Sequence, residues 1–427
     1  AWSGAYGKGA IASTGSTSWT DWRVWQAMRL VFAVPQSLDD PSGRGRYWPL
    51  ARELARLGHE VTLICLHPDL ASCRERRFER DGVQVRYVAQ MHVRKRAGTK
   101  TYYPAWALPW VAARATLAMA AALRGVEADA LHIAKAQPIN GLASLARPEW
   151  WRRASVYLDC DDHEAGSNNF QSGWQRALVA RVEDGLARRA RAISVNTSAG
   201  VQRIRSLGVP QERLVLVPNG VDRQRVRSLP PGLGENLRRR HGLLDAPLVV
   251  YVGSLSLASH AVDLLLDGFS LAARQRPDLR LALVGGGEDA AALQAQAARL
   301  GIEDSTLFVG AVGPEEALGW LQAADLSVDP ARDDPAHRAR APLKLVEAMA
   351  VGTPTLTSDV GDRRVTLGGG TAGYFVAPDD AEALGEGILA ALSDPEDRQE
   401  RARAALAAAE EYYWDRLVSR FLSLYTL

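Results

Sequence analysis

Residues 329–354 hold the side chains whose types and spacing are best suited to chemistry. Their first part is a loop that changes from acidic to basic, and their second part is a short apolar helix, 343–350, that carries Lys344 and Glu347. Residues three positions apart share one face of a helix. A carboxylate can bind two vicinal hydroxyls, and an ammonium can stabilise a departing phosphate group. The apolar residues around Glu347 predict that its carboxylate faces a cleft or a polar partner, with a surface ion pair or a buried structural glutamate as the alternatives.

Alternating strands and helices must position these two side chains. Short apolar runs alternate with amphipathic segments along the chain, which is typical of doubly wound α/β domains. The helix at 343–350 ends before Gly352 and Pro354, two residues that favour helix termination. We expect strands at 29–35, 60–66, 130–133, 155–158, 188–196 and 214–218 in the first half, and at 248–252, 279–284, 307–309, 326–328, 355–357 and 373–376 in the second.

Length and charge both divide the chain in two. A chain of 427 residues is too long for one typical core. Residues 28–228 carry 31 Lys and Arg against 19 Asp and Glu, whereas residues 229–427 carry 18 against 29. The change of sign falls beside the Pro- and Gly-rich stretch 229–232, which reads as a linker. Halves of opposite charge suggest two different partners, unless the first half is simply rich in arginine.

The cysteines and the hydropathy indicate a cytoplasmic protein. Cys65, Cys73 and Cys160 are odd in number and lack the spacing of metal ligands, so we expect no disulfide framework. The longest apolar candidate, 104–123, is interrupted by Pro109 and Arg114, which disfavours a transmembrane helix.

A glycine loop follows the first predicted strand. Gly43, Arg44 and Gly45 lie between that strand and an amphipathic helix at 47–57. Ligands of doubly wound sheets bind at the carboxyl ends of the strands. Glycines there let backbone N–H groups approach an anion, and Arg44 adds positive charge. The loop therefore predicts a phosphate contact, from a motif shorter than G-x-G-x-x-G.

Two further strand ends in the first half carry polar clusters. Several carboxylates and histidines at a strand end are unfavourable unless they bind something. The Asp-x-Asp spacing could ligate a divalent ion beside a diphosphate. We favour acceptor hydroxyl binding, because no other ligands stand at metal spacing, and keep a surface acidic loop as the alternative. The residues are His132 and Lys135 at the end of the strand at 130–133, and Asp161, Asp162, His163 and Glu164 after the strand at 155–158.

Basic residues precede aromatic ones at the start of residues 92–123. This order suits a membrane surface or a lipid-linked acceptor. A solvated turn that leads into a packed helix is the alternative. The basic residues are Arg94, Lys95, Arg96 and Lys100, and the aromatic residues are Tyr102, Tyr103, Trp106 and Trp110.

Residues 1–27 differ in composition from the rest of the chain. Small residues dominate as far as Ser18, and Trp19, Trp22 and Trp25 follow at three-residue spacing. We interpret the segment as an extension of separate origin and exclude it from the fold. The alternative is a short helix that lays its indoles on a surface or membrane interface.

From Met28 onward, the chain resembles the retaining GT-B glycosyltransferases of the large family 4 group. The resemblance rests on the order and spacing of five motifs together. These are VPNGVD (217–222), YVGSL (251–255), LALVGGGE (281–288), AADLSVDP (323–330) and PLKLVEAMAVGTP (342–354).

The resemblance implies an α/β fold with two Rossmann-like, doubly wound domains that face each other across a cleft. It implies an acceptor domain at 28–228, a linker at 229–235, a nucleotide-sugar domain at 236–410, and a final helix, 411–427, that returns to the first domain.

The resemblance also implies roles for particular residues. Glu347 would accept hydrogen bonds from the nucleotide ribose, and Gly253 and Gly285 would line the nucleotide cleft. The predicted donor site also includes residues of these motifs, the nearby Arg340 and the glycine loop. These residues are Ser254, Gly286, Pro342, Leu343, Arg340 and Gly43.

The chain departs from the family pattern at two places. Eight positions before Glu347, where a second glutamate often contacts the donor sugar, stands Ala339. Ser254 occupies the position of an arginine that often binds the diphosphate, and the lysine expected shortly after it is missing. Lys344 is then the best candidate to stabilise the leaving diphosphate, with Arg340 behind it.

These observations predict a retaining glycosyltransferase that uses a nucleoside-diphosphate sugar as co-substrate, without a metal or another cofactor. Its acceptor would be a polysaccharide or a lipid-linked glycan, and it would be cytoplasmic, with peripheral contact to the inner face of the membrane and no nucleic-acid partner. A GT-B protein that has lost catalysis and serves as a partner subunit is the alternative, and a nucleotide-sugar epimerase is a third. Catalysis is assigned to Lys344, Asp161 and His163, and acceptor binding to Asp162, Glu164, Arg44, His132 and Lys135. We expect Lys344→Ala to reduce turnover far more than folding stability.

Overall fold

The computed structural model describes residues 26–40, 43–96, 99–104, 106–161, 163–167, 170, 172–257 and 260–427. Residues 1–25, which include the three spaced tryptophans, and Asp162 of the predicted acceptor site lie outside the described residues. In the described part, no helix is long and apolar enough to cross a membrane.

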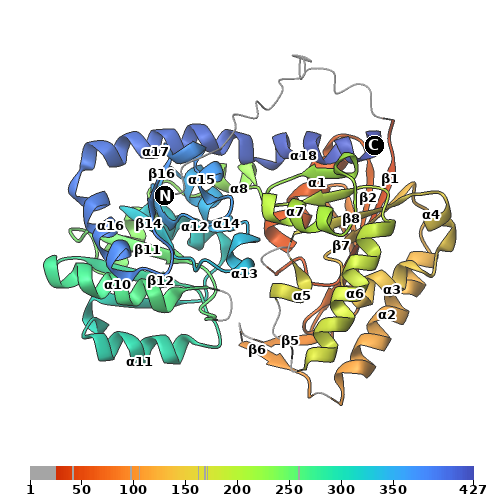
Figure 1. Ribbon diagram of the computed structural model, residues 1–427, viewed down its shortest axis with the longest axis horizontal. Helices are drawn as coiled ribbons and strands as arrows, with labels where there is room; N and C mark the ends of the chain where they lie inside the picture. Colours follow the sequence, from red (N-terminus) through yellow and green to blue (C-terminus); the bar gives the residue numbers. More distant parts are fainter. Residues whose placement is uncertain are drawn as a thin grey trace, which may run out of the picture.

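Two separate β-sheets form the centres of the two halves (Figure 1). The first sheet has the strand order β10-β9-β8-β7-β1-β2-β4-β3, in which only β3 runs antiparallel to its neighbour. Its strands are β1 (Arg29–Val34), β2 (Glu60–His67), β3 (Arg77–Arg80), β4 (Val83–Gln90), β7 (Ala130–Ala134), β8 (Val156–Cys160), β9 (Ile193–Val195) and β10 (Leu214–Leu216).

The second sheet is parallel throughout, with the order β13-β12-β11-β14-β15-β16. Strand β11 is a continuous apolar run, as expected where helices cover both faces of a sheet. The strands are β11 (Leu248–Val252), β12 (Arg280–Val284), β13 (Thr306–Gly310), β14 (Leu326–Asp329), β15 (Thr355–Ser358) and β16 (Gly373–Val376).

Alternate residues of each central strand enter different cores. In β1, Val31 and Ala33 pack under helices α2 (Leu108–Arg124), α3 (Pro138–Ser144) and α6 (Gly173–Arg189). Leu30, Phe32 and Val34 pack on the other face under α1 (Trp48–Arg56) and α18 (Trp414–Leu422). Strand β11 divides its side chains in the same way, between α10 (Val262–Gln275) with α16 (Ala381–Ser393) and α9 (Leu233–Arg240) with α12 (Pro314–Ala323). Because successive side chains of a strand point to opposite faces, each sheet is covered by helices on both sides, and each half has three layers.

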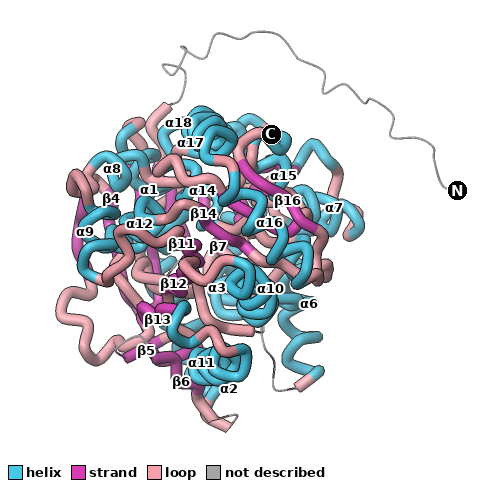
Figure 2. The backbone as a smooth tube through the Cα atoms, turned by 90° about the vertical axis from the view of Figure 1, so that its left-hand side faces the viewer, coloured by secondary structure: helices cyan, strands magenta, loops and turns pink. Residues whose placement is uncertain are grey.

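The end of the chain spans both halves. Helix α17 (Pro395–Ala409) packs on α14 (Leu343–Ala350) of the second half, and α18 then continues onto the first sheet (Figure 1). Trp414 of α18 donates a hydrogen bond from Nε1 to the carbonyl of Gly45 at 2.8 Å. In the turned view of Figure 2, α17 and α18 again lie at one end of the molecule, opposite strands β5 (Val93–Arg96) and β6 (Thr99–Tyr102).

The structure confirms the predicted α/β class of both halves and corrects several elements. The edge strands β3 and β4 and the β5–β6 hairpin had no counterpart in the sequence analysis. Of the predicted strand at 188–196, the first two residues are the end of α6, 190–192 form a bend, and only β9 is extended. Arginine-rich α6 conceals its helical period because its buried face is narrow, with Glu183, Leu186 and Ala187.

Candidate functional site

The centre of the candidate site is the carboxylate of Asp329, at the end of β14. It is buried and lies 2.8 Å from Nε of Arg363 and 3.1 Å from Nζ of Lys344. Burial alone would raise the pKa of Asp329, but these two cations hold it below its ordinary value. The carboxylate is therefore charged, and it fixes two cations at the carboxyl edge of the second sheet.

Lys344 is almost completely enclosed, with 6% of its side chain exposed. Its ammonium lies over the ring of Tyr251, 4.0 Å from the ring centre. Burial lowers its pKa, and the Asp329 carboxylate opposes that shift. Arg340, close enough to lower the same pKa, has a buried Nη1 with no hydrogen-bond partner among the described residues. The positive charges of Lys344, Arg363 and Arg340 together thus exceed the single negative charge of Asp329.

Backbone packing explains why glycines follow β11 and β12. A Cβ on Gly285 would lie 1.8 Å from the carbonyl oxygen of Gly253, and one on Gly287 would lie 2.2 Å from that of Leu255. A Cβ on Gly253 would lie 3.1 Å from Nζ of Lys344. The two loops are therefore in direct contact beside the cations. Ser254 and Gly286, which were also predicted here, contribute backbone carbonyls that accept hydrogen bonds within these loops.

Glu347 lies on the same helix as Lys344 but has a different partner. Arg225 of α8 (Arg223–Arg227) donates to Oε1 of Glu347 through Nη2. No ion pair joins Lys344 to Glu347, both of which are described, so the surface-pair alternative does not apply. The Glu347 side chain is 16% exposed. A ribose could reach this carboxylate only by sharing it with Arg225.

Pro342, Leu343 and Ala339 lie where the two halves touch. Asn219 donates to the carbonyl of Ala341 at 2.8 Å, and Thr197 donates to that of Ala339 at 3.2 Å. A Cβ on Gly45 would lie only 2.4 Å from Cδ1 of Leu343, so the first half approaches α14 closely. Pro342 precedes the first residue of α14 and supplies its N-cap.

The predicted acceptor residues form a buried network in the first half. Nζ of Lys135 lies 3.0 Å from Asp161 and 3.5 Å from Glu164, and Gln137 donates to Glu164 at 2.7 Å. Lys135 has a φ of +53°, a left-handed conformation that is unfavourable for a residue with a side chain and is found at functional sites. The structure thus brings together three residues that the sequence placed on two separate strands.

His163 lies on the open side of this network, with about a third of its side chain exposed. Its Nε2 is 4.0 Å from Glu183, whose carboxylate accepts hydrogen bonds from the backbone of Glu164 and Ala165. Burial lowers the pKa of His163 and raises that of Glu183 to about 7. A neutral imidazole at this place can accept a proton.

A cavity of about 320 Å³ runs from His163 to the second half. Both halves contribute to its wall, so a ligand in it would touch both. The lining residues include Cys160, Asn196, Thr197 and Arg203 from the first half, and Pro335, Arg338 and Ala339 from the second.

Three predicted site residues lie elsewhere. His132 is fully buried, accepts or donates a 2.6 Å hydrogen bond with Tyr425, and stacks on Phe32, so it packs the core instead of contacting an acceptor. Burial lowers its pKa to about 3. Arg44 is exposed and 3.9 Å from Asp39. A Cβ on Gly43 would meet the carbonyl of Ser37 at 2.4 Å, so this glycine serves chain packing.

The sequence analysis missed Arg46, the arginine that this loop buries. Its guanidinium donates to both oxygens of Asp159, at 2.8 and 2.6 Å, and to the carbonyl of Val217 at 3.0 Å. It also donates to Asn219, which contacts the second half. The alternation of Arg44 and Arg46 within the glycine loop was the available signal, but the sequence did not show which of them points inward.

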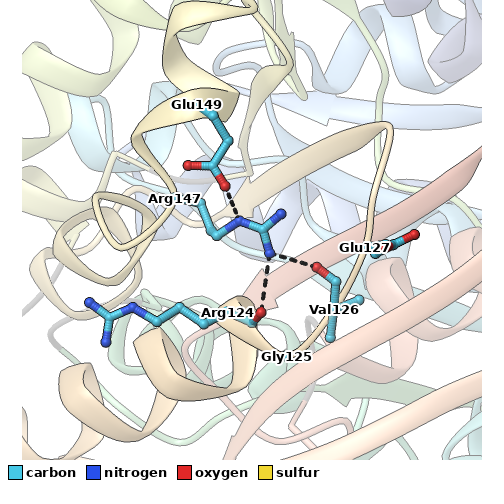
Figure 3. Close-up of a pocket in the computed structure, with 6 residues that line it drawn as sticks. All are labelled: Arg124, Gly125, Val126, Glu127, Arg147 and Glu149. Atoms are coloured by element: carbon cyan, nitrogen blue, oxygen red, sulfur yellow. Dashed lines mark hydrogen bonds and ion pairs between the residues drawn. The ribbon is translucent and has the colours of Figure 1, made fainter.

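A larger cavity, about 570 Å³, lies away from these residues, between the end of α2 and α4 (Pro148–Arg152). Figure 3 shows Arg147 in its wall, with hydrogen bonds to Glu149 and to the carbonyls of Arg124 and Val126. Nε and Nη1 of Arg147 therefore bind neighbouring groups of the chain itself. Within the described ranges, no cluster of three or more His, Cys, Asp or Glu side chains could hold a metal ion.

Two family descriptions match the chain. Residues 43–220 match the "Glycosyl transferase 4-like domain", and residues 235–407 match "Glycosyl transferases group 1". The D-inositol 3-phosphate glycosyltransferase of Acidothermus cellulolyticus is 29% identical over 251 residues, which is 57% of this chain and 54% of that protein. The GDP-mannose-dependent alpha-(1-6)-phosphatidylinositol monomannoside mannosyltransferase of Mycolicibacterium smegmatis is 28% identical, over 65% of this chain and 69% of its own length. The match spans about half the length of the first of these relatives.

Solved structures share the whole fold. Sucrose-phosphate synthase from Thermosynechococcus elongatus superposes with a TM-score of 0.71 at 19% identity, covering 93% of this chain and 98% of its own. Anabaena Alr3699/HepE in complex with UDP gives 0.67 at 18% identity, covering 94% and 100%.

Proposed function

This chain belongs to the group 1 glycosyltransferases with the GT-B fold, and we propose that it transfers a sugar from a nucleoside diphosphate to an acceptor hydroxyl with retention of configuration. The curated relatives named above are glycosyltransferases, and a structural neighbour has been solved in complex with UDP. Both facts support a nucleotide-sugar donor.

The observation that carries the proposal is the excess of buried positive charge beside the glycine loops. Lys344 and Arg363 flank one carboxylate, and Arg340, which lies near Lys344, keeps a buried donor that has no partner among the described residues. A diphosphate gains negative charge as its bond to the sugar breaks. Preorganised cations and backbone N–H groups at this edge would stabilise that charge. In this proposal, Lys344 pairs with Asp329 and adds positive charge to the site without touching the phosphate. Arg340, whose Nη1 has no partner in the described part of the chain, would bind the phosphate directly.

The acceptor would enter from the first half. Lys135, Asp161 and Glu164 form a fixed polar wall, and His163 lies at the cavity that both halves line. In the proposed reaction, the acceptor hydroxyl binds to this wall, and its proton passes to a neighbouring base or to the departing phosphate. The basic first half favours an anionic acceptor, such as a lipid-linked glycan or a growing polysaccharide.

Calorimetric titration with UDP, GDP and ADP tests the donor site, with the matching nucleosides as a second series. We expect one nucleoside diphosphate to bind and Arg340→Gln to weaken it by about 10- to 100-fold, the range for a charge-assisted hydrogen bond. Affinity for the nucleoside should not change. Arg364→Gln is the matched control, because Arg364 is exposed and paired with Asp359 at 2.6 Å. Equal effects of the two substitutions would contradict the placement of the diphosphate.

The pairing of Glu347 with Arg225 favours one other reading, a GT-B subunit that binds nucleotide without turnover. A panel of nucleotide sugars separates the two. Transfer or slow hydrolysis of a donor supports the enzyme, whereas binding without either, on every acceptor tried, supports the subunit.

A further inference from the structure

The outer surface of the first half carries large apolar side chains that nothing in the described chain covers. On α2, Trp110 and Leu117 are 73% and 70% exposed, and Trp106 just before the helix is 77% exposed. Leu142 and Leu145, in and after α3, and Trp174 and Leu178 of α6 are also exposed. Helix α3 packs against both α2 and α6, so these residues belong to one layer of helices (Figure 1).

On α2, these exposed apolar residues lie on the side opposite to the one that packs into the core. Ala115, Met119 and Leu123 of α2 point into the core and are completely buried. Trp110, Arg114, Leu117 and Ala121 follow at intervals of three or four and lie on the opposite side, which solvent would normally cover with polar residues. Helix α2 is therefore apolar on both sides, although a soluble environment requires only one.

The charge of the same region is of one sign. No acidic residue occurs between Asp81 and Glu127, a stretch that contains Arg86, Arg94, Lys95, Arg96, Lys100, Arg114 and Arg124. Helix α6 adds Arg176, Arg181, Arg188 and Arg189. Its two carboxylates are already engaged, because Glu183 is buried and Asp184 pairs with Arg203 at 2.8 Å.

We propose that the α2–α3–α6 face docks on an anionic lipid bilayer. Exposed tryptophans among arginines match the interface of such a membrane, where indole rings lie at the headgroup level and cations meet lipid phosphates. The residues project from the outer side of a helical layer instead of lining a groove, which fits a flat partner better than an inserted peptide. The arrangement fits peripheral attachment, not insertion of a helix across the bilayer.

The same layer connects to the proposed acceptor site. Glu183 of α6 accepts the backbone hydrogen bonds of Glu164 and Ala165, at the open side of the polar wall. Docking would therefore hold that site near the membrane surface, where a lipid-linked acceptor would be presented. This consequence rests on the proposed function, whereas the docking itself does not.

Flotation of the full chain with vesicles tests the proposal. We expect the protein to float with vesicles of phosphatidylcholine mixed with phosphatidylglycerol, and much less with phosphatidylcholine alone. Replacing Trp106, Trp110 and Leu117 by Ser should weaken binding at least about tenfold, because each removes an aromatic or aliphatic side chain that the interface would bury. Val365→Ser is the control, since Val365 is 71% exposed on the other half.

A second variant separates charge from apolar contact. Arg114→Gln with Arg181→Gln should weaken binding to the anionic vesicles by about 25-fold, from roughly fivefold for each basic residue at the surface. Binding to neutral vesicles should stay the same. All substituted side chains are exposed, so the variants should melt as the parent does.

Three results would overturn the proposal. The first is that the parent protein fails to float with anionic vesicles, and the second is that the control variant loses as much binding as the tryptophan variant. The third is that sedimentation without lipid shows self-association that the tryptophan variant abolishes, which would assign the face to a second copy of the chain.

Discussion

Replacing Lys344 by Met tests whether the buried cation cluster is a structural unit. The substitution keeps an unbranched side chain, one atom shorter, and removes its charge, which leaves Arg363 as the remaining ion-pair partner of Asp329 among the described residues. Breaking a buried ion pair costs about 3–5 kcal/mol. Because Arg363 stays 2.8 Å from the carboxylate, we expect the lower end, about 3 kcal/mol. The sequence alone suggested a large effect on turnover and a small one on stability, and the burial of Lys344 revises this expectation.

Scanning calorimetry measures the loss. For a unit of roughly 150–250 residues, 1 kcal/mol shifts Tm by about 2–4 °C, so the transition that includes the second half should fall by about 6–12 °C. Arg364→Met, which breaks an exposed pair, should shift it by less than about 2 °C. Asp329→Asn alone should also destabilise, and the double variant should lose less than the sum of the single ones. If Lys344→Met melted with the control, the ion pair would contribute nothing, and the reasoning from burial would fail.

Two other predictions concern the first half. Gly45→Ala should destabilise by about 1–3 kcal/mol, because the new Cβ would lie 2.4 Å from Leu343, and Leu343→Ala should relieve part of that loss, as a thermal double-mutant cycle would reveal. An additive cycle would show that the halves do not touch there. Burial raises the pKa of Glu183 from 4.5 to about 7, so the folded state holds this proton more tightly than the unfolded state does. The resulting stabilisation is complete below pH 4.5 and is lost as the pH rises to 7, by about 3 kcal/mol relative to Glu183→Gln. Urea unfolding of both proteins from pH 4 to 8 checks this, and a difference that does not change with pH contradicts it.

Much of the second half was predictable because its signals are local. Helix α14 has the bounds that its apolar residues and the following Gly352 and Pro354 indicated. Strands β11 and β12 are largely apolar runs followed by glycines. Length and charge indicated two halves, and the family resemblance, carried by five motifs, added the expectation of two Rossmann-like domains that face each other across a cleft.

The partners of the site residues were not predictable, because each comes from a distant segment. Glu347 meets Arg225, which lies 122 positions earlier, and Arg46 meets Asp159 across 113 positions. No spacing rule covers such pairs. The partner of His132 was equally unpredictable, because Tyr425, in the turn that follows α18, lies 293 positions later in the chain. The roles of Lys344, His163 and the other predicted site residues in transfer stay predictions.

The return of the chain to the first half has a mechanical consequence. Residues near Val221 lead out of the first half, and residues near Tyr413 lead back, and these two segments are joined by a parallel β-bridge. Arg223 clamps them, with 2.9 Å contacts to Glu410 and Asp415 and its guanidinium over the Tyr413 ring. A connection of two strands fastened side by side resists twisting but still allows bending. The two halves should therefore open and close by bending about this connection. Such a hinge motion would change the separation between the edge that carries Lys344 and the edge that carries His163.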